Sequence, residues 1–361
     1  MQKKLIALAI AAAFSAPAFA DNSNVSLYGK AFLNFEHVTN DMKNPGSANR
    51  VQTNASRFGL KGGEDLGDGM KAFYQYEVQV DADGDGAASA TKNGGFGNGT
   101  RNTGVGLQGA FGQVIYGNWD TPYKTARNAI ELFDNTTVFS AINLMGRANG
   151  AAGKNYNTRK NSALAYVSPA IGPVGVTLAY SPDEAPVAPA NKHVTSLAAT
   201  LNMDGGIYAA LAYEIRNDAS VTTTKDTAMR LVGKYTLGDM WFGAAIERLK
   251  VNTTLTANYT QSNMELAGQY KMGPSNIGLS YAKAGKTSVD KTGASQVSLR
   301  YGYNFSKRTE VFAAYALLKN DAVNTAVAGS GGTYGFSAGT AYGTAAGSKS
   351  TAIGLGMIHS F

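Results

Sequence analysis

The side chains that most often do chemistry in enzymes are sparse in this sequence and do not gather. Its three histidines stand far apart and lack the spacing of metal ligands: His37, His193 and His359. Only His193 has hydroxyl groups near it, on Thr195 and Ser196, and hydroxyl-rich stretches are common in strands. An enzyme would need a nucleophile and a base held at one site. We therefore expect no catalytic residues and no enzymatic activity.

One acidic segment resembles the start of a calcium-binding loop. Its aspartates alternate with other residues and precede a glycine: Asp81, Asp83, Asp85 and Gly86. The twelfth position is Lys92, where such a loop needs a bidentate glutamate, so the pattern fails as an EF-hand. Weak divalent binding at an exposed acidic loop is the alternative. Cysteine is absent, which excludes disulfides and thiolate sites, and we predict no metal and no cofactor.

Carboxylates in the longest connecting segment could instead act on solutes through their charge. This segment runs over Asp120–Arg159, and connections of that length usually have a functional reason. At its middle, Leu132 and Phe133 could pack on a wall while Glu131 and Asp134 face an aqueous channel. A surface lid whose acids are merely solvated is the alternative.

Basic residues of other segments could face those carboxylates. Four are expected on an inner basic wall: Arg57, Lys71, Arg101 and Arg159. Strict alternation groups Arg101 with the apolar Val105 and Leu107, but it stands at the end of its segment, where a long side chain can turn inward. A basic wall opposite an acidic loop creates a transverse field that orders dipolar solutes and biases ions. For each basic residue alone, an ordinary solvated charge is the alternative.

These side chains need a scaffold, and the period of the sequence predicts strands. Apolar and polar residues alternate over long stretches, as where Leu211 and Tyr213 oppose Glu214 and Arg216. After residue 20, no apolar run approaches the roughly 20 residues of a spanning helix. We expect sixteen strands, near residues 24–36, 51–63, 69–80, 101–111, 112–119, 160–168, 173–181, 192–203, 206–216, 226–237, 240–250, 260–272, 275–284, 293–305, 308–319 and 350–361.

The connections between these strands alternate in length. Short ones such as Asp204-Gly205 and Gly273-Pro274 take turns with long ones such as Asp81–Thr100 and Asn320–Lys349. Short turns on one side and long loops on the other are typical of outer-membrane barrels, whereas a soluble sandwich has no reason to keep that order. A closed barrel also leaves no strand edge with unpaired backbone groups, and lipid offers such groups no hydrogen-bond partner. The sequence thus predicts an all-β transmembrane barrel of sixteen antiparallel strands, with short periplasmic turns, long extracellular loops and the third loop folded into the pore.

The final strand is expected to close this barrel. Its outward face forms a row of alternate residues: Ile353, Leu355, Met357, His359 and Phe361. The strand must pair with the first one, near Val25–Gly29, to leave no open edge. Phe361 therefore ends a lipid-facing row.

The first 20 residues are expected to be a cleaved secretory signal peptide, with the barrel at 21–361. Lys3 and Lys4 form a basic start, an apolar stretch follows, and Ala18–Ala20 is a small-x-small cleavage site. Removing the two lysines lowers the formal charge from +7 to +5. No basic run suggests nucleic-acid binding.

At this point the sequence resembles the trimeric general porins of the Gram-negative outer membrane, particularly the β-proteobacterial group that includes the neisserial porins. The residues that carry the resemblance are Val25–Gly29, Ser56–Gly62, Glu64–Gly67, Gly69–Ala72, Val105–Leu107, Phe111-Gly112, Asn161-Ser162, Tyr166 and His359–Phe361. The resemblance implies a homotrimer, and it implies that arginines matching Arg57, Arg101 and Arg159 line the constriction. It also implies that Phe361 is read by the barrel-assembly machinery. Many relatives carry an arginine where this chain has Asn118, so one cationic site is missing.

The expected function is passive diffusion of small hydrophilic solutes and ions across the outer membrane, with a mild anion preference. The expected surroundings are outer-membrane lipids and lipopolysaccharide. A substrate-specific channel for sugars or organic anions, or a receptor barrel, is the alternative, and an adhesin is a more distant one. A sugar channel would need aromatic residues along the lumen, yet here Tyr208 and Phe312 are the exceptions among outward-facing rings.

Overall fold

Strands make up nearly all of the regular structure in the computed structural model, which describes residues 25–41, 46–83, 96–134, 136–148, 154–255, 258–322, 332–336 and 346–361. The expected signal peptide at 1–20 lies outside the described residues. The later part of the aspartate segment, with Asp85, Gly86 and Lys92, lies outside them too.

The first five of the sixteen strands include two that are interrupted. Their elements are β1 (Ser26–Asn40), β2 (Ser47–Thr53), β3 (Arg57–Gly67), β4 (Met70–Val80), β5 (Phe96–Thr100), β6 (Thr103–Gly109) and β7 (Gly112–Asp120). β2 and β3 pair with successive parts of β1, so they act as one strand broken at residues 54–56. β5 and β6 likewise share β4, with residues 101 and 102 between them. At each break the strict alternation of side chains is reset.

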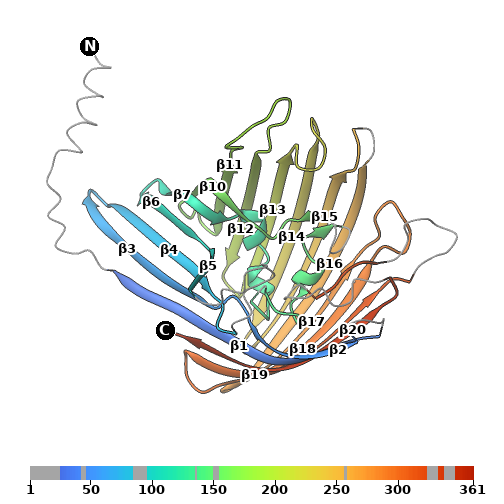
Figure 1. The fold of residues 1–361 in the computed structure, drawn as a ribbon. Helices are drawn as coiled ribbons and strands as arrows, with labels where there is room; N and C mark the ends of the chain where they lie inside the picture. Colours follow the sequence, from blue (N-terminus) through green and yellow to red (C-terminus); the bar gives the residue numbers. More distant parts are fainter. Residues whose placement is uncertain are drawn as a thin grey trace, which may run out of the picture.

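The rest of the sheet is a regular run of hairpins. Its strands are β10 (Arg159–Val167), β11 (Val174–Ser181), β12 (Val194–Met203), β13 (Ile207–Asn217), β14 (Lys225–Leu237), β15 (Met240–Asn252), β16 (Asn258–Met272), β17 (Ser275–Ala284), β18 (Ala294–Asn304), β19 (Thr309–Asn320) and β20 (Lys349–Ser360). Each pairs antiparallel with the next, β10 pairs with β7, and β20 pairs with β1. With each interrupted pair counted as one, sixteen strands form a closed ring, as predicted (Figure 1).

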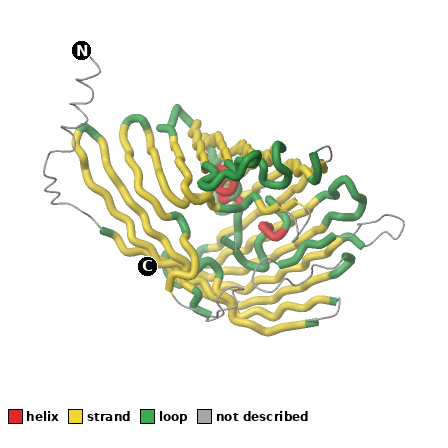
Figure 2. Tube along the Cα trace, turned by 45° about the horizontal axis from the view of Figure 1, so that its top comes forward, coloured by secondary structure: helices red, strands yellow, loops and turns green. Residues whose placement is uncertain are grey.

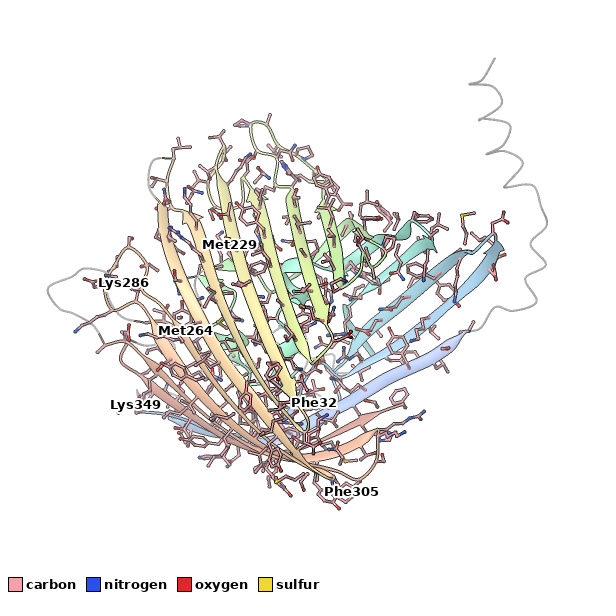
Figure 3. The ribbon with its side chains drawn as sticks, turned by 180° about the vertical axis from the view of Figure 1, so that it is seen from behind. Phe32, Met229, Met264, Lys286, Phe305 and Lys349 are labelled. Carbon is pink, nitrogen blue, oxygen red and sulfur yellow. The ribbon has the colours of Figure 1, made fainter. Side chains whose placement is uncertain are left out.

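The two ends of the strands differ in the same way as the predicted connections. β14 and β15 are joined by Gly238 and Asp239 alone, and Gly238 has a φ of 56°, which this tight reversal requires. At the opposite end, a long connection joins β7 to β10. Figure 3 shows Phe305 at the short-turn end, and Lys286 and Lys349 at the long-loop end.

The two faces of the ring carry different residues. Outward-facing side chains are apolar and exposed, including Met229 and Met264, which Figure 3 labels. On the same strands, Arg230 and Glu265 face inward and are buried. Because an exposed apolar face is stable against lipid and not against water, this inversion of a soluble protein's pattern fits a membrane barrel.

The long connection between β7 and β10, residues 121–158, is called loop L3. Its described residues, 121–134, 136–148 and 154–158, lie inside the ring (Figure 2). Its elements are α2 (Pro122–Thr125), the 3-10 turns η1 (Asn128–Ile130) and η2 (Ala141–Asn143), and the short strands β8 (Arg147–Ala148) and β9 (Lys154–Asn155). Figure 2 shows the helical turns in red, surrounded by yellow strands. Among the described residues, no helix is long and apolar enough to span a membrane.

Candidate functional site

A cluster of cations lines the inner wall where β1, β3 and β4 meet loop L3. Arg57 on β3 stands directly opposite Lys30 on β1 in the strand register. Two like charges in that position repel. The carboxylate of Asp134 in loop L3 offsets the repulsion, because its Oδ2 lies 3.0 Å from Arg57 Nη2 and also pairs with Lys30 Nζ.

Arg101 joins this cluster from the break between β5 and β6. Its Nε donates to Glu77 Oε1 at 2.5 Å, and Arg57 Nη1 lies 4.0 Å from the same oxygen. The break explains why strict alternation misplaces Arg101: the alternation stops at Thr100 and restarts at Thr103. The amide of Asn118 donates to the carbonyl oxygens of Thr100 and Arg101 and so supports the chain at this point.

Arg159 occupies the far side of the cluster, at the start of β10. Its Nε lies 3.0 Å from Asp120 Oδ1 and donates to Asn102 Oδ1 at 2.8 Å. Lys124 in helix α2 pairs with the same Asp120 oxygen. Arg101 lies close enough to Arg159 for the two charges to repel.

We call these residues the open cluster: Lys30, Arg57, Glu77, Arg101, Asp120, Lys124, Asp134 and Arg159. It contains five cations and three carboxylates. The side chains of Arg57 and Asp134 remain 21% and 36% exposed within a ring that water can fill. The open cluster therefore presents a net positive charge to the lumen.

One pKa in the open cluster is shifted outside the strands. Burial lowers the pKa of Lys124 from 10.5 to about 8, and the carboxylate of Asp120 opposes part of that shift. Arg159 adds to the lowering by repulsion. Lys124 is thus a cation at neutral pH that loses its proton in mildly alkaline solution.

Lys71, which was expected on the basic wall, lies at a different height along the barrel from Arg57. Lys71 faces inward as expected, but it stands opposite Asp65 at the short-turn end of β4, whereas Arg57 stands opposite Gln79. Eight residues of strand separate the two positions, about 26 Å along the strand at the usual rise. Alternation predicts whether a side chain faces the lumen or the lipid. It does not predict the height of the residue along the barrel axis.

Glu131, which was expected beside Asp134 in the channel, has its contacts within loop L3 instead. Its carboxylate accepts the backbone N–H of Phe133 at 2.7 Å and the hydroxyl of Ser140 at 2.9 Å, and it pairs with Arg127. Glu131 therefore faces the interior of loop L3. Asp134 lies against the cations as predicted.

A second group of charges fixes loop L3 to the opposite wall; we call it the anchor cluster. It consists of Tyr123, Arg127, Glu131, Arg230, Glu247 and Glu265. Arg127 Nη1 lies 2.8 Å from both oxygens of Glu265, and Arg230 Nη2 lies 2.8 Å from Glu247 Oε2. The phenol of Tyr123 donates to Glu247 at 2.9 Å, and its ring stacks under Arg230 at 4.1 Å. The charged side chains of the anchor cluster are at most 5% exposed.

Glycines on the wall receive the apolar side chains of loop L3. A Cβ atom on Gly243 would collide with Ile130, and one on Gly278 would lie 3.0 Å from Leu132 Cδ2. Gly354 leaves the same kind of space for Phe139. Phe133 is buried, with its ring 5.8 Å from that of Phe139. Leu132 and Phe133 thus pack inside the barrel, as the sequence suggested.

Several residues of the open cluster were not identified from the sequence. Lys30 lies on the polar face of its strand, so alternation placed it inward without showing that Arg57 is its neighbour. Asp120 and Lys124 stand where a strand passes into loop L3, and no local pattern marks them.

Phe361 closes the ring through its backbone, which exchanges hydrogen bonds of 3.0 and 3.1 Å with Gly29. In the part of the chain that the structure describes, no group of three or more His, Asp or Glu side chains is placed to hold a metal ion.

Comparisons with known proteins agree on one family. A family model described as Gram-negative porin matches residues 7–323. Outer membrane porin protein 32 of Delftia acidovorans is 29% identical, with 100% of both chains covered. Major outer membrane protein P.IB of Neisseria gonorrhoeae is 25% identical over 88% of this chain and 94% of its own length. The solved structure of the anion-selective porin from Comamonas acidovorans has a TM-score of 0.80 at 24% identity, covering 94% of this chain and 100% of its own.

Proposed function

This chain belongs to the Gram-negative porin family, and from that premise we propose that its pore passes small anions more readily than cations. As a porin of the outer membrane, it forms a water-filled channel through which small hydrophilic solutes and ions diffuse passively. Porins are channels rather than enzymes, and we propose no catalytic activity for this chain.

The observation that carries the proposal is the charge of the open cluster. Five cations oppose three carboxylates, and the second acid of the loop segment, Glu131, is withdrawn into the loop interior. Fixed positive charge in a narrow aqueous passage raises the local concentration of anions and lowers that of cations. Asn118 adds no further cation, so the preference is mild.

The assembly of this porin is a further part of the proposal. We propose a homotrimer in a bilayer with lipopolysaccharide, inserted by the barrel-assembly machinery through a signal that includes Phe361. The resemblance to trimeric porins supports this, and an outer membrane protein of the same fold, OmpT of Vibrio cholerae, is described in a trimer form. We also propose that residues 1–20 are removed on export.

A planar-bilayer recording in a potassium chloride gradient tests the proposal. The reversal potential should have the sign of chloride selectivity, and conductance should rise in groups of three equal steps. Zero current or a potassium-selective reversal potential would overturn it. Block of the current by a particular sugar or organic anion at low concentration would favour a substrate-specific channel instead.

A further inference from the structure

The carboxylate of Glu131 is fully engaged inside loop L3. One oxygen accepts the backbone N–H of Phe133, and the other accepts the hydroxyl of Ser140 and the guanidinium of Arg127. Its side chain is 5% exposed, whereas that of Asp134, three residues further along, is 36% exposed. Two acids of one short segment thus have opposite access to water.

Arg127 is the residue that makes the buried position of Glu131 possible. It precedes the turn η1, which Glu131 follows, so this turn brings the two side chains together. Its other amino group lies 2.8 Å from both oxygens of Glu265 on β16. The side chain of Arg127 is 1% exposed, so little water is available to stabilise the two carboxylates beside it. The positive charge of Arg127 stabilises them instead.

From this geometry we propose that Arg127 is a positioning residue for ion selectivity, because it keeps the carboxylate of Glu131 out of the lumen. This role rests on the proposed anion preference, which Arg127 would help to maintain. If Glu131 turned toward the lumen, a fourth carboxylate would face the five cations of the open cluster.

The physical reason is the cost of an unpaired buried charge. Without Arg127, the carboxylates of Glu131 and Glu265 would share a volume that holds little water, and each would lose its counter-charge. Glu131 lies on a turn of loop L3, so its side chain can rotate into the nearest water. That water is in the lumen, which Asp134 of the same segment already reaches.

The first experiment compares two single substitutions, Glu131→Gln and Asp134→Asn, by reversal potential in a salt gradient. Each removes one negative charge from loop L3 while leaving a similar shape. Asp134→Asn should raise the chloride-to-potassium permeability ratio about two- to fivefold, the effect of about one kcal/mol for a solvated neighbouring charge. Glu131→Gln should leave the ratio unchanged, because its charge is already compensated. An equal rise in both variants would place Glu131 in the lumen and overturn the inference.

The second experiment removes Arg127 itself. In Arg127→Met/Glu265→Gln the wall carboxylate is neutralised, so Glu131 alone is left without a positive counter-charge. The permeability ratio should fall about two- to fivefold, by the same charge estimate. Adding Glu131→Gln should restore it, which loss of structure alone would not do. Glu265→Gln alone is the matched control and should keep the wild-type ratio. A ratio that does not fall in the double variant, or is not restored in the triple, would contradict the inference.

These outcomes are separate from a failure of the proposed function. Zero conductance or potassium selectivity in the wild-type porin would overturn the anion preference itself. The role of Arg127 is judged only from differences between variants that conduct. If the double variant does not insert, an equal rise of the ratio in Glu131→Gln and Asp134→Asn still overturns the inference, and an unchanged ratio in Glu131→Gln supports its premise that the carboxylate is kept out of the lumen.

Discussion

The open cluster and the anchor cluster are built from the same residue types, arginines paired with carboxylates on facing elements, but differ in their access to water. In the open cluster, Arg57 keeps 21% of its side chain exposed and shares Asp134 with Lys30. In the anchor cluster, Arg230 and Glu247 are fully buried. Charges screened by water act on passing solutes, whereas buried charges act on the fold. Exposure, and not residue type, therefore separates selectivity from stability in this barrel.

The largest expected effect is on stability and comes from the anchor cluster. Arg230→Met leaves Glu247 buried without its cation and removes the cation that stacks on Tyr123. Unfolding should become easier by about 3–5 kcal/mol, the usual result of breaking a buried ion pair. The midpoint of urea unfolding measures this. Arg159→Met in the open cluster is the control, and its cost should stay within about 1 kcal/mol. Similar losses of unfolding free energy in Arg230→Met and Arg159→Met would contradict the distinction between the two clusters.

A smaller effect is expected where loop L3 meets the wall. Gly243→Ala adds a methyl group that collides with Ile130, so the loop must shift, at a cost of about 1–3 kcal/mol. Gly233→Ala, on the neighbouring strand, meets no atom within 4 Å and should be nearly neutral. Urea midpoints and the noise of the open-channel current report the two consequences. Equal midpoints for both variants would show that the glycine space at 243 does not hold the loop.

The open cluster should respond in selectivity more than in stability. Arg57→Glu reverses one charge beside Lys30 and Asp134, and the chloride-to-potassium permeability ratio should fall about tenfold, or about 1.4 kcal/mol. Lys71→Glu makes the same charge change about 26 Å away along the barrel wall and should have little effect. Reversal potentials measure both. A large change of the reversal potential in Lys71→Glu would show that Lys71 also contributes to ion selectivity.

The smallest expected effect is a pH dependence. The pKa of Lys124 is lowered to about 8, so this side chain is charged at pH 7 and mostly neutral at pH 9. The open cluster loses one positive charge over that range, and the anion preference should weaken as the pH rises. Lys124→Arg should weaken this dependence, because arginine stays protonated there. Reversal potentials recorded between pH 6 and 9 check the prediction, and an unchanged slope in Lys124→Arg would assign the titration to another group.

Much of the architecture could be predicted from the sequence, because alternation is a local property. The faces of β13 to β16 follow directly from it, and the alternating lengths of the connections indicate closure. The levels of Arg57 and Lys71 could not be read in this way, since level depends on strand register. The burial of Glu131 was also hidden, because its cation Arg127 is held by Glu265, which comes from a strand far along the chain. Local sequence patterns thus predict the strands of the barrel wall. Contacts between residues far apart in the chain determine which charged side chains are exposed to solutes in the lumen.

The pairing of β20 with β1 makes the integrity of the wall depend on the whole length of the chain between them. These strands are the first and last in sequence order, and they are held side by side along eleven residue pairs, from Lys30 opposite Ser360 to Asn40 opposite Ser350. A chain that stops before β20 would leave the backbone groups of β1 and β19 unpaired in lipid, where no solvent can satisfy them. Closure therefore makes the sealing of the wall against the bilayer depend on β20, the strand that is synthesised after all the other described strands.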